Sequence, residues 1–423
     1  VMNFNGVADG DEKILSVIEA AERRGVLLDG HASVLTGRRL QAFRAAGIDS
    51  DHTTACPEKL REELALGFTV QIQECVLTAE LVTAMNELPI QNRVCLVTDD
   101  VPLPRLMHEG HLNYVARRAI ALGLDPLKAI RFCTINPADR LRLYDTGALV
   151  PGRRAELMLV EDLRELRPSL VMTGGVPVWQ EGVFSVRLPF GSGKDVWGTA
   201  LRDSLRLERF SPADFEITCE VPPDFQGGRA LVNLIGQDGV SLRTKRVQRE
   251  VPLNFVSPGL AKPDTSGLLR MTVWNRYGEH RHGTALVGGM EEFSGALALT
   301  YGHDSHNLSV YGSDPDDMAA AANALLETHG GICAVQGGKV LALVPLPLAG
   351  LLSEKRPAEL LKELDAFLEA CNRMGFRRRD PLSLLTLLPL AVSMEIRCTD
   401  KGLLDVANRR FLPLVEKIEE GTI

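Results

Sequence analysis

The sequence predicts an α/β protein, with helices and parallel strands alternating over residues 1–145 and a separate α+β region near the end. Three observations lead to this prediction. Helical and apolar segments alternate at regular spacing, a glycine follows most of the helices, and each apolar segment ends in polar residues. Such a repeat is typical of right-handed βα crossovers, which lay their strands parallel in one sheet. We therefore expect the ends of these strands to lie on one side.

Four helix and strand units can be assigned in order. The helices are expected at 11–24, 36–46, 57–66 and 78–88, and the strands at 26–31, 48–52, 68–74 and 93–98. The residues that close these strands are His31, His52, Glu74, Asp99 and Asp100. In a (β/α)8 barrel the C-terminal strand ends converge on one mouth, where the active site is built. We therefore expect His31, His52, Glu74 and Asp99 to share that mouth.

The chemistry of these residue types points to a metal site. Two histidines and an aspartate are suitable ligands for a divalent cation that activates water. Taken singly, each has a simpler interpretation: a histidine after a strand is more often a loop residue, and Glu74 suits the cap of the next helix. The coincidence of several such residues at successive strand ends favours chemistry.

Composition limits the other possibilities. The chain has 423 residues, 45% of them hydrophobic and 24% charged, which is enough for two or three domains with separate cores. A net charge of −8 predicts no nucleic-acid partner and no anionic membrane surface. The eight cysteines form no C-x-x-C pair, and we find no signal peptide or membrane-spanning run. A reducing cytoplasm is the expected location.

Several motifs resemble one enzyme family in the family's own order. These are "VMNFNGV", "DGHASVLTG", "AAGIDSDHT", "TDD" followed by "EGHLNYVARRAIALGLDPLKAIRFCTINPA", and "HDSHN" at 303–307. They resemble the adenine deaminases of the amidohydrolase superfamily. The resemblance implies the C-terminal half of a metal-dependent (β/α)8 barrel over 1–145, a small β-sandwich segment at 146–187, a linker at 188–205 and a C-terminal α+β domain at 206–423.

The resemblance also implies roles for particular residues. His31, His52 and Asp99 match metal positions, and His52 and Asp99 match catalytic ones. Asp99 would pass a proton from water to the departing amine, converting adenine and water to hypoxanthine and ammonia. Glu74 and Asp100 match the substrate side, although Cys75 stands where the family has serine. The implied cofactor is a divalent metal, manganese or iron first and zinc as a further candidate, in an enzyme of purine salvage.

The sequence departs from the family pattern in ways that shape our expectations. The superfamily's His-x-His spacing occurs here at His280 and His282 alone, and four βα units do not close an eight-stranded barrel. We therefore expect a fragment that begins inside the fourth barrel strand and is inactive by itself. "TDDVPLP" also replaces the family's usual "TDDRHP". Two alternatives stay open: another superfamily hydrolase of a cyclic amidine or amide, and a non-catalytic remnant for binding or assembly.

The region after residue 145 contributes further expectations. "LPFGSGKDVWG", at 188–198, has linker composition, and the α+β domain beyond it should contain strands near 269–275 and 296–299. Helices are expected at 315–328 and 357–374, and a hairpin at Gly337 and Gly338. His303, Asp304 and His306 suit either a second metal site or a polar turn, and the sequence favours neither. The expected partner is adenine, and assembly into a homo-oligomer is left open.

Overall fold

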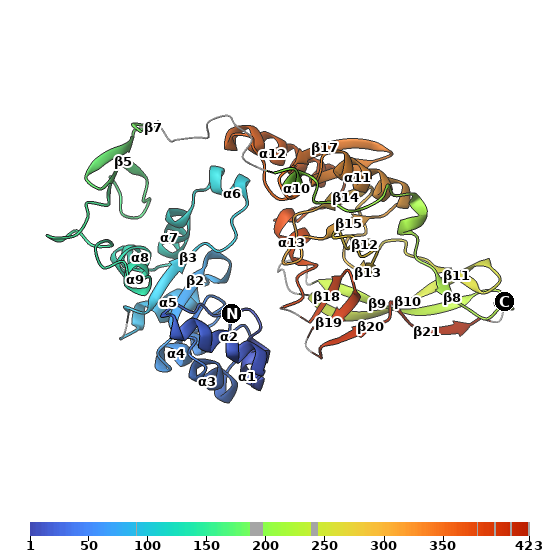
Figure 1. Cartoon of the computed structure of the whole chain (residues 1–423), viewed down its shortest axis with the longest axis horizontal. Coiled ribbons are helices and arrows are strands. Elements are labelled where there is room, and N and C mark those ends of the chain that lie inside the picture. Colours follow the sequence, from blue (N-terminus) through green and yellow to red (C-terminus); the bar gives the residue numbers. More distant parts are fainter. Residues whose placement is uncertain are drawn as a thin grey trace. The chain divides into compact units, whose positions relative to one another are not determined.

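A computed structural model describes residues 1–89, 91–186, 198–237, 244–378, 380–392, 395–406 and 408–421 of the chain. The chain divides into two compact units (Figure 1). The first consists of Val1–Val101 and Arg105–Ser192, and the second of Pro102–Pro104 and Gly193–Ile423. Residues 188–197 of the expected linker lie outside the described residues.

A parallel sheet with strand order β1-β2-β3 organises the first unit. Its strands are β1 (Ser50–Asp51), β2 (Thr69–Gln73) and β3 (Val94–Val97). In the register of this sheet, Ser50 is paired with Thr69, and Val70 with Val94. Residues 94–96 of β3 are buried, as a strand covered by helices on both faces should be. The expected parallel arrangement is therefore confirmed for these strands.

Helices precede β1, separate the three strands and follow β3. They are α1 (Phe4–Asp9), α2 (Glu12–Arg23), α3 (Gly37–Ala45), α4 (Pro57–Ala65), α5 (Ala79–Glu87), α6 (Leu103–His108), α7 (Leu112–Ala121), α8 (Pro126–Cys133) and α9 (Ile135–Arg140), with a 3-10 turn η1 (Glu74–Val76). Local chemistry explains several starts: the side chain of Asp11 caps α2, that of Thr78 caps α5, and Pro57 opens α4. The helices expected at 11–24, 36–46, 57–66 and 78–88 are confirmed.

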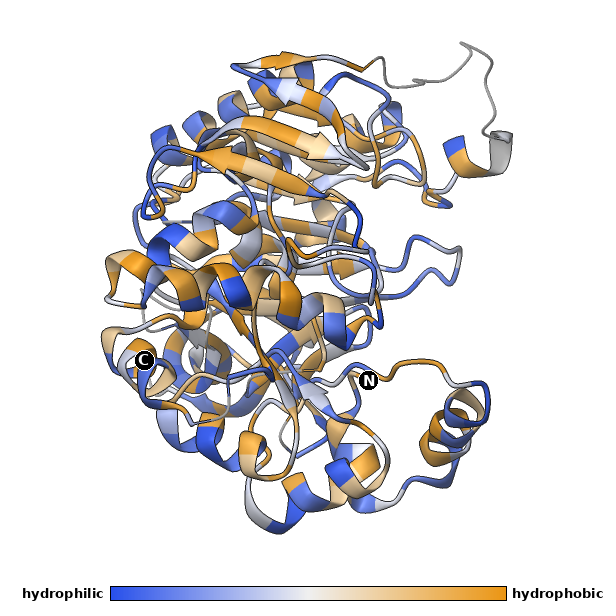
Figure 2. Cartoon of the chain, turned by 90° about the vertical axis from the view of Figure 1, so that its left-hand side faces the viewer, coloured by the Kyte–Doolittle hydropathy of each residue, from blue (hydrophilic) through white to orange (hydrophobic). Residues whose placement is uncertain are grey.

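The core of this unit lies between the helices and the sheet. Phe43, Phe68 and Phe132 are fully buried in it, together with aliphatic residues of β2 and β3. Figure 2 shows helices that carry both hydrophilic and hydrophobic residues, as expected for helices with one face on a core. Across the described part of the chain, no helix combines the length and apolarity that spanning a bilayer requires.

The strand expected at 26–31 is wrong, because no strand is assigned there. The segment is extended, and its backbone bonds to Val1: the Val1 amino group donates to the Asp29 carbonyl, and the His31 amide donates to the Val1 carbonyl. Toward β1 it bonds through a side chain instead, since the Gly30 amide donates to Ser50 Oγ at 3.1 Å. A Cβ on Gly30 would lie 2.1 Å from the Ser50 carbonyl oxygen, so only glycine permits this approach.

A four-stranded antiparallel sheet follows in the first unit. Its strands are β4 (Leu157–Val160), β5 (Pro168–Thr173), β6 (Val176–Gln180) and β7 (Val183–Phe184). The turn between β5 and β6 contains Gly174 and Gly175, both with positive φ, which such tight turns favour. The short strands and glycine turns expected in this region are confirmed.

The second unit is built on one large sheet, which among the described residues has the order β17-β16-β14-β15-β12-β13-β9-β10-β11-β8, with β21 beside β9. These strands are β8 (Cys219–Glu220), β9 (Gly228–Gln237), β10 (Thr244–Ser257), β11 (Leu260–Pro263), β12 (Leu269–Trp274), β13 (His282–Val287), β14 (Ala296–Leu299), β15 (Leu308–Gly312), β16 (Gly331–Gln336), β17 (Lys339–Pro345) and β21 (Val415–Glu420). A smaller sheet contains β18 (Ile396–Thr399), β19 (Gly402–Asp405) and β20 (Arg410–Leu412).

Helices cover this large sheet on two sides. The helical elements of the unit are α10 (Thr199–Arg202), η2 (Pro212–Phe215), α11 (Pro315–Glu327), α12 (Pro357–Arg373) and α13 (Pro381–Leu387). One core contains Met318 of α11 with Ala298 and Val310 of the sheet, and another contains Phe367 of α12 with Leu297. Alternate residues of β14 thus serve different cores. The expected α+β character, including the hairpin of β16 and β17, is confirmed.

Candidate active site

Two histidines lie close together beside the end of β1. His31 follows the extended segment after Gly30, and His52 follows β1 directly. His31 Nδ1 and His52 Nε2 are 3.1 Å apart, and the ring centroids are separated by 4.9 Å. The Phe4 ring stacks on the His31 ring, with centroids 6.0 Å apart. The fold therefore brings together residues that are 21 positions apart, with two ring nitrogens facing each other.

Gln73 connects this pair to Asp99. Its side-chain amide donates to the His52 carbonyl oxygen at 3.0 Å and to Asp99 Oδ2 at 2.6 Å. Asp99 follows β3, adopts a positive φ of 55° and is exposed. Because β1, β2 and β3 are parallel, the residues after each strand lie at one edge of the sheet. The structure thus brings His31, His52 and Asp99 to the same edge, with Gln73 between the last two.

Glu74, a substrate-side candidate, is paired with two arginines from the helices that follow β3. It is buried, with 8% of its side chain exposed, and Arg105 donates to its Oε2 at 2.5 Å. Arg118 lies 3.5 Å from its Oε1, and the Arg105 guanidinium lies over the Tyr114 ring. Both carboxylate oxygens of Glu74 therefore face arginines. Asp100, the other substrate-side candidate, is exposed beside Asp99.

A buried charged cluster lies behind the histidines. Lys59 Nζ is 3.0 Å from Asp51 Oδ2 and 3.5 Å from Glu63 Oε1, and both carboxylate side chains have 0% exposure. Thr54 donates to Glu63, and Thr53 Oγ1 donates to both oxygens of Asp51 at 2.8 Å. This cluster was not predicted from the sequence. One signal was present, because Asp51 directly precedes His52.

Burial sets the protonation of these groups. The pKa of Glu63 is raised to about 8 by its burial and then by the charge of Asp51, so Glu63 is mostly protonated at neutral pH. Burial alone would raise the pKa of Asp51, but Lys59 and several hydrogen bonds lower it. The pKa of His31 falls to about 4 through burial and the nearby His52. His31 is therefore a neutral imidazole at neutral pH, which is the form that binds metals.

The C-terminal histidines form a separate group in the second unit. His303 and His306 have ring centroids 6.1 Å apart, and Tyr301 stacks on His306 at 5.9 Å. The backbone of this turn is closed by hydrogen bonds, since the Gly302 amide donates to His306 Nδ1 at 3.3 Å and the His306 amide donates to the Gly302 carbonyl. Asp304 Oδ1 is 4.0 Å from His303 Nδ1. These contacts fit the polar-turn interpretation.

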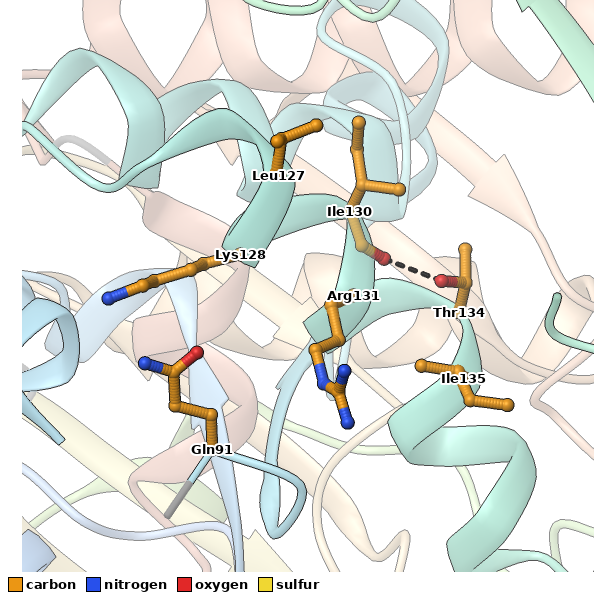
Figure 3. Close-up of a pocket in the computed structure, with 7 residues that line it drawn as sticks. All are labelled: Gln91, Leu127, Lys128, Ile130, Arg131, Thr134 and Ile135. Carbon is orange, nitrogen blue, oxygen red and sulfur yellow. Dashed lines mark hydrogen bonds between the residues drawn. The ribbon is translucent and has the colours of Figure 1, made fainter. Parts of the chain in front are cut away.

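Two further observations bear on where ligands can bind. Within the ranges that the structure describes, no three side chains of His, Cys, Asp or Glu gather closely enough to hold a metal ion. A shallow hollow of about 420 Å³ lies beside α8 (Figure 3). It is lined by Gln91, Leu127, Lys128, Ile130, Arg131, Thr134 and Ile135. Because Gln91 precedes β3 and Asp99 follows it, this hollow lies at the other end of that strand from the histidines.

Comparison with known proteins matches most of the chain. Residues 1–178 match the Amidohydrolase family, and residues 241–410 match the Adenine deaminase C-terminal domain. An adenine deaminase of Desulfatibacillum aliphaticivorans is 34% identical over 98% of this chain and 71% of its own length. The chain belongs to the adenine deaminase family. The adenine deaminase 2 of Carboxydothermus hydrogenoformans, 33% identical over 98% of this chain and 70% of its own, agrees.

Solved structures add less to this assignment to the adenine deaminase family. The crystal structure of N-acetyl-D-glucosamine-6-phosphate deacetylase from Mycobacterium smegmatis is 22% identical and covers 40% of this chain and 52% of that one. Its TM-score of 0.34 is too low to support a structural argument. The amidohydrolase match and the observed helices and strands together establish a mixed α/β fold.

Proposed function

We propose that this chain takes part in the hydrolytic deamination of adenine to hypoxanthine and ammonia. Adenine deaminases match 98% of the chain, and the C-terminal match is to a domain named after that enzyme. The observation that carries the proposal is the pair of facing nitrogens of His31 and His52, next to the Asp99 carboxylate that Gln73 holds. The chain is accordingly a hydrolase of carbon–nitrogen bonds, and purine salvage in the cytoplasm is its proposed setting.

A divalent cation is implied by the amidohydrolase match, and the histidine pair fits one. Nitrogens that both bind one ion at about 2.0–2.1 Å lie roughly 3 Å apart, close to the 3.1 Å between His31 Nδ1 and His52 Nε2. The lowered pKa of His31 keeps its imidazole neutral, which is the form that binds a cation. When bound, the cation supplies the Lewis acid that makes water a nucleophile at neutral pH. Manganese or iron is the proposed metal, with zinc as a further candidate.

Asp99 is the proposed general base. Gln73 donates to its Oδ2, which fixes the carboxylate and leaves the second oxygen to accept a proton from the attacking water. As water adds to C6 of adenine, Asp99 takes this proton and delivers it to the amino nitrogen, which leaves as ammonia when the C–N bond breaks. His52 is proposed to act with Asp99 in the same step, as a catalytic as well as a metal-binding residue.

Two residues, Asp100 and Glu74, are assigned to the substrate side, and their roles differ. Asp100 is exposed next to Asp99, and we assign it a direct contact with the purine. Glu74 supports that side indirectly, because its oxygens are held by Arg105 and Arg118. A second polar site is proposed in the second unit, at His303, Asp304 and His306.

The finer architecture is also a proposal. The parallel strands β1, β2 and β3 with their helices are proposed to be part of a (β/α)8 barrel, and β4 to β7 part of a β-sandwich. The parallel register and the alternation with helices support the first assignment, and the antiparallel hairpins with glycine turns support the second.

The test is whether hypoxanthine forms from adenine in the presence of Mn²⁺ or Fe²⁺, as measured by chromatography. Two preparations are assayed: the chain alone, and the chain co-expressed with the part of the Desulfatibacillum aliphaticivorans relative that lies outside the match. In the active preparation, Asp99→Asn should lower turnover by about 10² to 10⁴, because it removes the general base.

The matched control is Asp11→Asn. Asp11 caps α2 through its side chain, and asparagine caps equally well, so turnover should be unchanged. Absence of hypoxanthine from both preparations would overturn the proposed activity. Full turnover in Asp99→Asn would overturn the assigned base.

A further inference from the structure

Asp51 touches the chain next to both histidines. Its Oδ1 accepts a hydrogen bond from the Ala32 amide at 2.7 Å, and Ala32 directly follows His31. Asp51 is itself the residue before His52. One buried carboxylate is therefore bonded to the residue after the first histidine and attached through the backbone to the second.

Lys59 supplies a second link between the same two segments. Its ammonium donates to the Ser33 carbonyl, two residues after His31, and to Thr53 Oγ1 at 3.4 Å, one residue after His52. It also pairs with Asp51 at 3.0 Å. The lysine therefore spans from α4 to both segments, although its own helix contains neither histidine.

These links matter because the backbone ladder here is short. β1 has two residues, and the segment before His31 is not a strand. The Gly30 amide bonds to the Ser50 side chain and not to the β1 backbone. Backbone hydrogen bonds between the two segments therefore contribute little to fixing the distance between the rings, and buried side chains must do so.

We propose that Asp51 and Lys59 are positioning residues that hold His31 and His52 at the separation needed to bind one cation together. The inference rests on the proposed function in taking these histidines as metal ligands. It adds that the spacing of the two rings is set by the buried ion pair of Asp51 and Lys59. Groups that orient metal ligands in this way typically change metal affinity by about 10- to 100-fold when they are removed.

The experiment uses the full chain with Asp51→Asn and Lys59→Met. Asparagine keeps an acceptor for Ala32 but removes the charge that Lys59 needs, and methionine keeps length but removes the donor to Ser33. The matched control is Lys128→Met, because Lys128 also donates to a backbone carbonyl of the first unit, that of Asn86. Circular dichroism selects the variants that fold.

Two readouts are taken. The first is the nuclear Overhauser effect between the His31 and His52 rings in metal-free, histidine-labelled protein, assigned with His31→Gln and His52→Gln. The second is Co²⁺ affinity by titration calorimetry. Both positioning variants should lose the ring-to-ring signal and bind Co²⁺ about 10- to 100-fold more weakly, whereas Lys128→Met should match the wild type.

A milder variant keeps the proposal testable if Lys59→Met does not fold. Thr53→Val removes two hydrogen bonds to Asp51 while the ion pair stays, so it should weaken Co²⁺ binding less than Asp51→Asn does. An unchanged ring signal and affinity in folded Asp51→Asn would overturn the positioning role while leaving the metal assignment. If His31→Gln and His52→Gln bind Co²⁺ as tightly as the wild type does, the metal assignment is overturned. The ring-to-ring signal of the metal-free protein would still decide the positioning role in that case.

Discussion

Replacing Glu63 by glutamine should change how the stability of the chain depends on pH. In the folded chain the pKa of Glu63 is raised from 4.5 to about 8 by burial and by Asp51. A carboxyl whose pKa is raised on folding binds its proton more tightly in the folded state. The unfolding free energy therefore falls as pH rises through the interval from 4.5 to about 8.

The size of this effect follows from the same shift. Each pH unit inside the interval lowers the unfolding free energy by about 1.4 kcal/mol, so the step from pH 5.5 to 7.5 should cost roughly 3 kcal/mol through Glu63 alone. Glutamine keeps the shape and the hydrogen-bonding capacity but has no proton to lose. Glu63→Gln should therefore lack this part of the pH dependence.

The assay is urea unfolding followed by circular dichroism at pH 5.5 and 7.5, for both proteins. Comparing the two differences cancels other titrating groups, among them His31. Its lowered pKa acts in the opposite sense, making the folded state more stable as pH rises from about 4 to 6.5. If Glu63→Gln loses as much stability between the two pH values as the wild type, Glu63 is not the buried acid described.

Two other substitutions test contacts at opposite ends of β3. Gln73→Leu removes the donor to Asp99 and to the His52 carbonyl. Turnover in the active preparation should therefore fall by about tenfold or more, while the urea midpoint of unfolding changes little. An unchanged turnover would exclude a role for Gln73 in orienting Asp99. Asn136→Ala removes the amide that donates to the Gln91 and Val94 carbonyls, each at 2.6 Å. The free energy of unfolding should therefore fall by about 2–4 kcal/mol. A loss below about 1 kcal/mol in urea unfolding would show that water replaces the amide.

Local signals in the sequence were sufficient to predict α2 to α5 and the strands β1 to β3 of the first unit. The helices could be predicted because their starts contain side chains that cap, such as Asp11 and Thr78, or a proline at the first turn, Pro57. The strand β3 could be predicted because a run buried on both faces is uniformly apolar. These features depend on neighbours in sequence, and a single sequence displays them directly.

The strand predicted before His31 was wrong for a reason that lies outside its own residues. Its apolar composition suits a strand, but the strand assignment depends on which partners offer backbone groups. Here the Gly30 amide bonds to the Ser50 hydroxyl, and the His31 amide bonds to the carbonyl of a single residue, Val1. Pairing of this kind is tertiary information that composition does not contain.

The candidate site divides in the same way. His31, His52 and Asp99 could be proposed because each follows an apolar segment, and parallel crossovers place the ends of such segments on one side. Lys59 and Glu63 could not, because a lysine and a glutamate four residues apart on a helix usually form an exposed pair. Their burial depends on how α4 packs against the loop after β1, which no local pattern reports.

The contact between Ala32 and Asp51 has a consequence for motion at this edge. Amide protons inside a strand ladder are released only when neighbouring strands separate, which for a central strand requires unfolding of much of the domain. The Ala32 amide is instead held by a carboxylate, and the Gly30 amide by a hydroxyl. Rotation of one side chain can therefore expose each of them while β2 and β3 stay paired. Hydrogen exchange at these two amides would then measure small openings beside the histidine pair, separately from the stability of the whole unit.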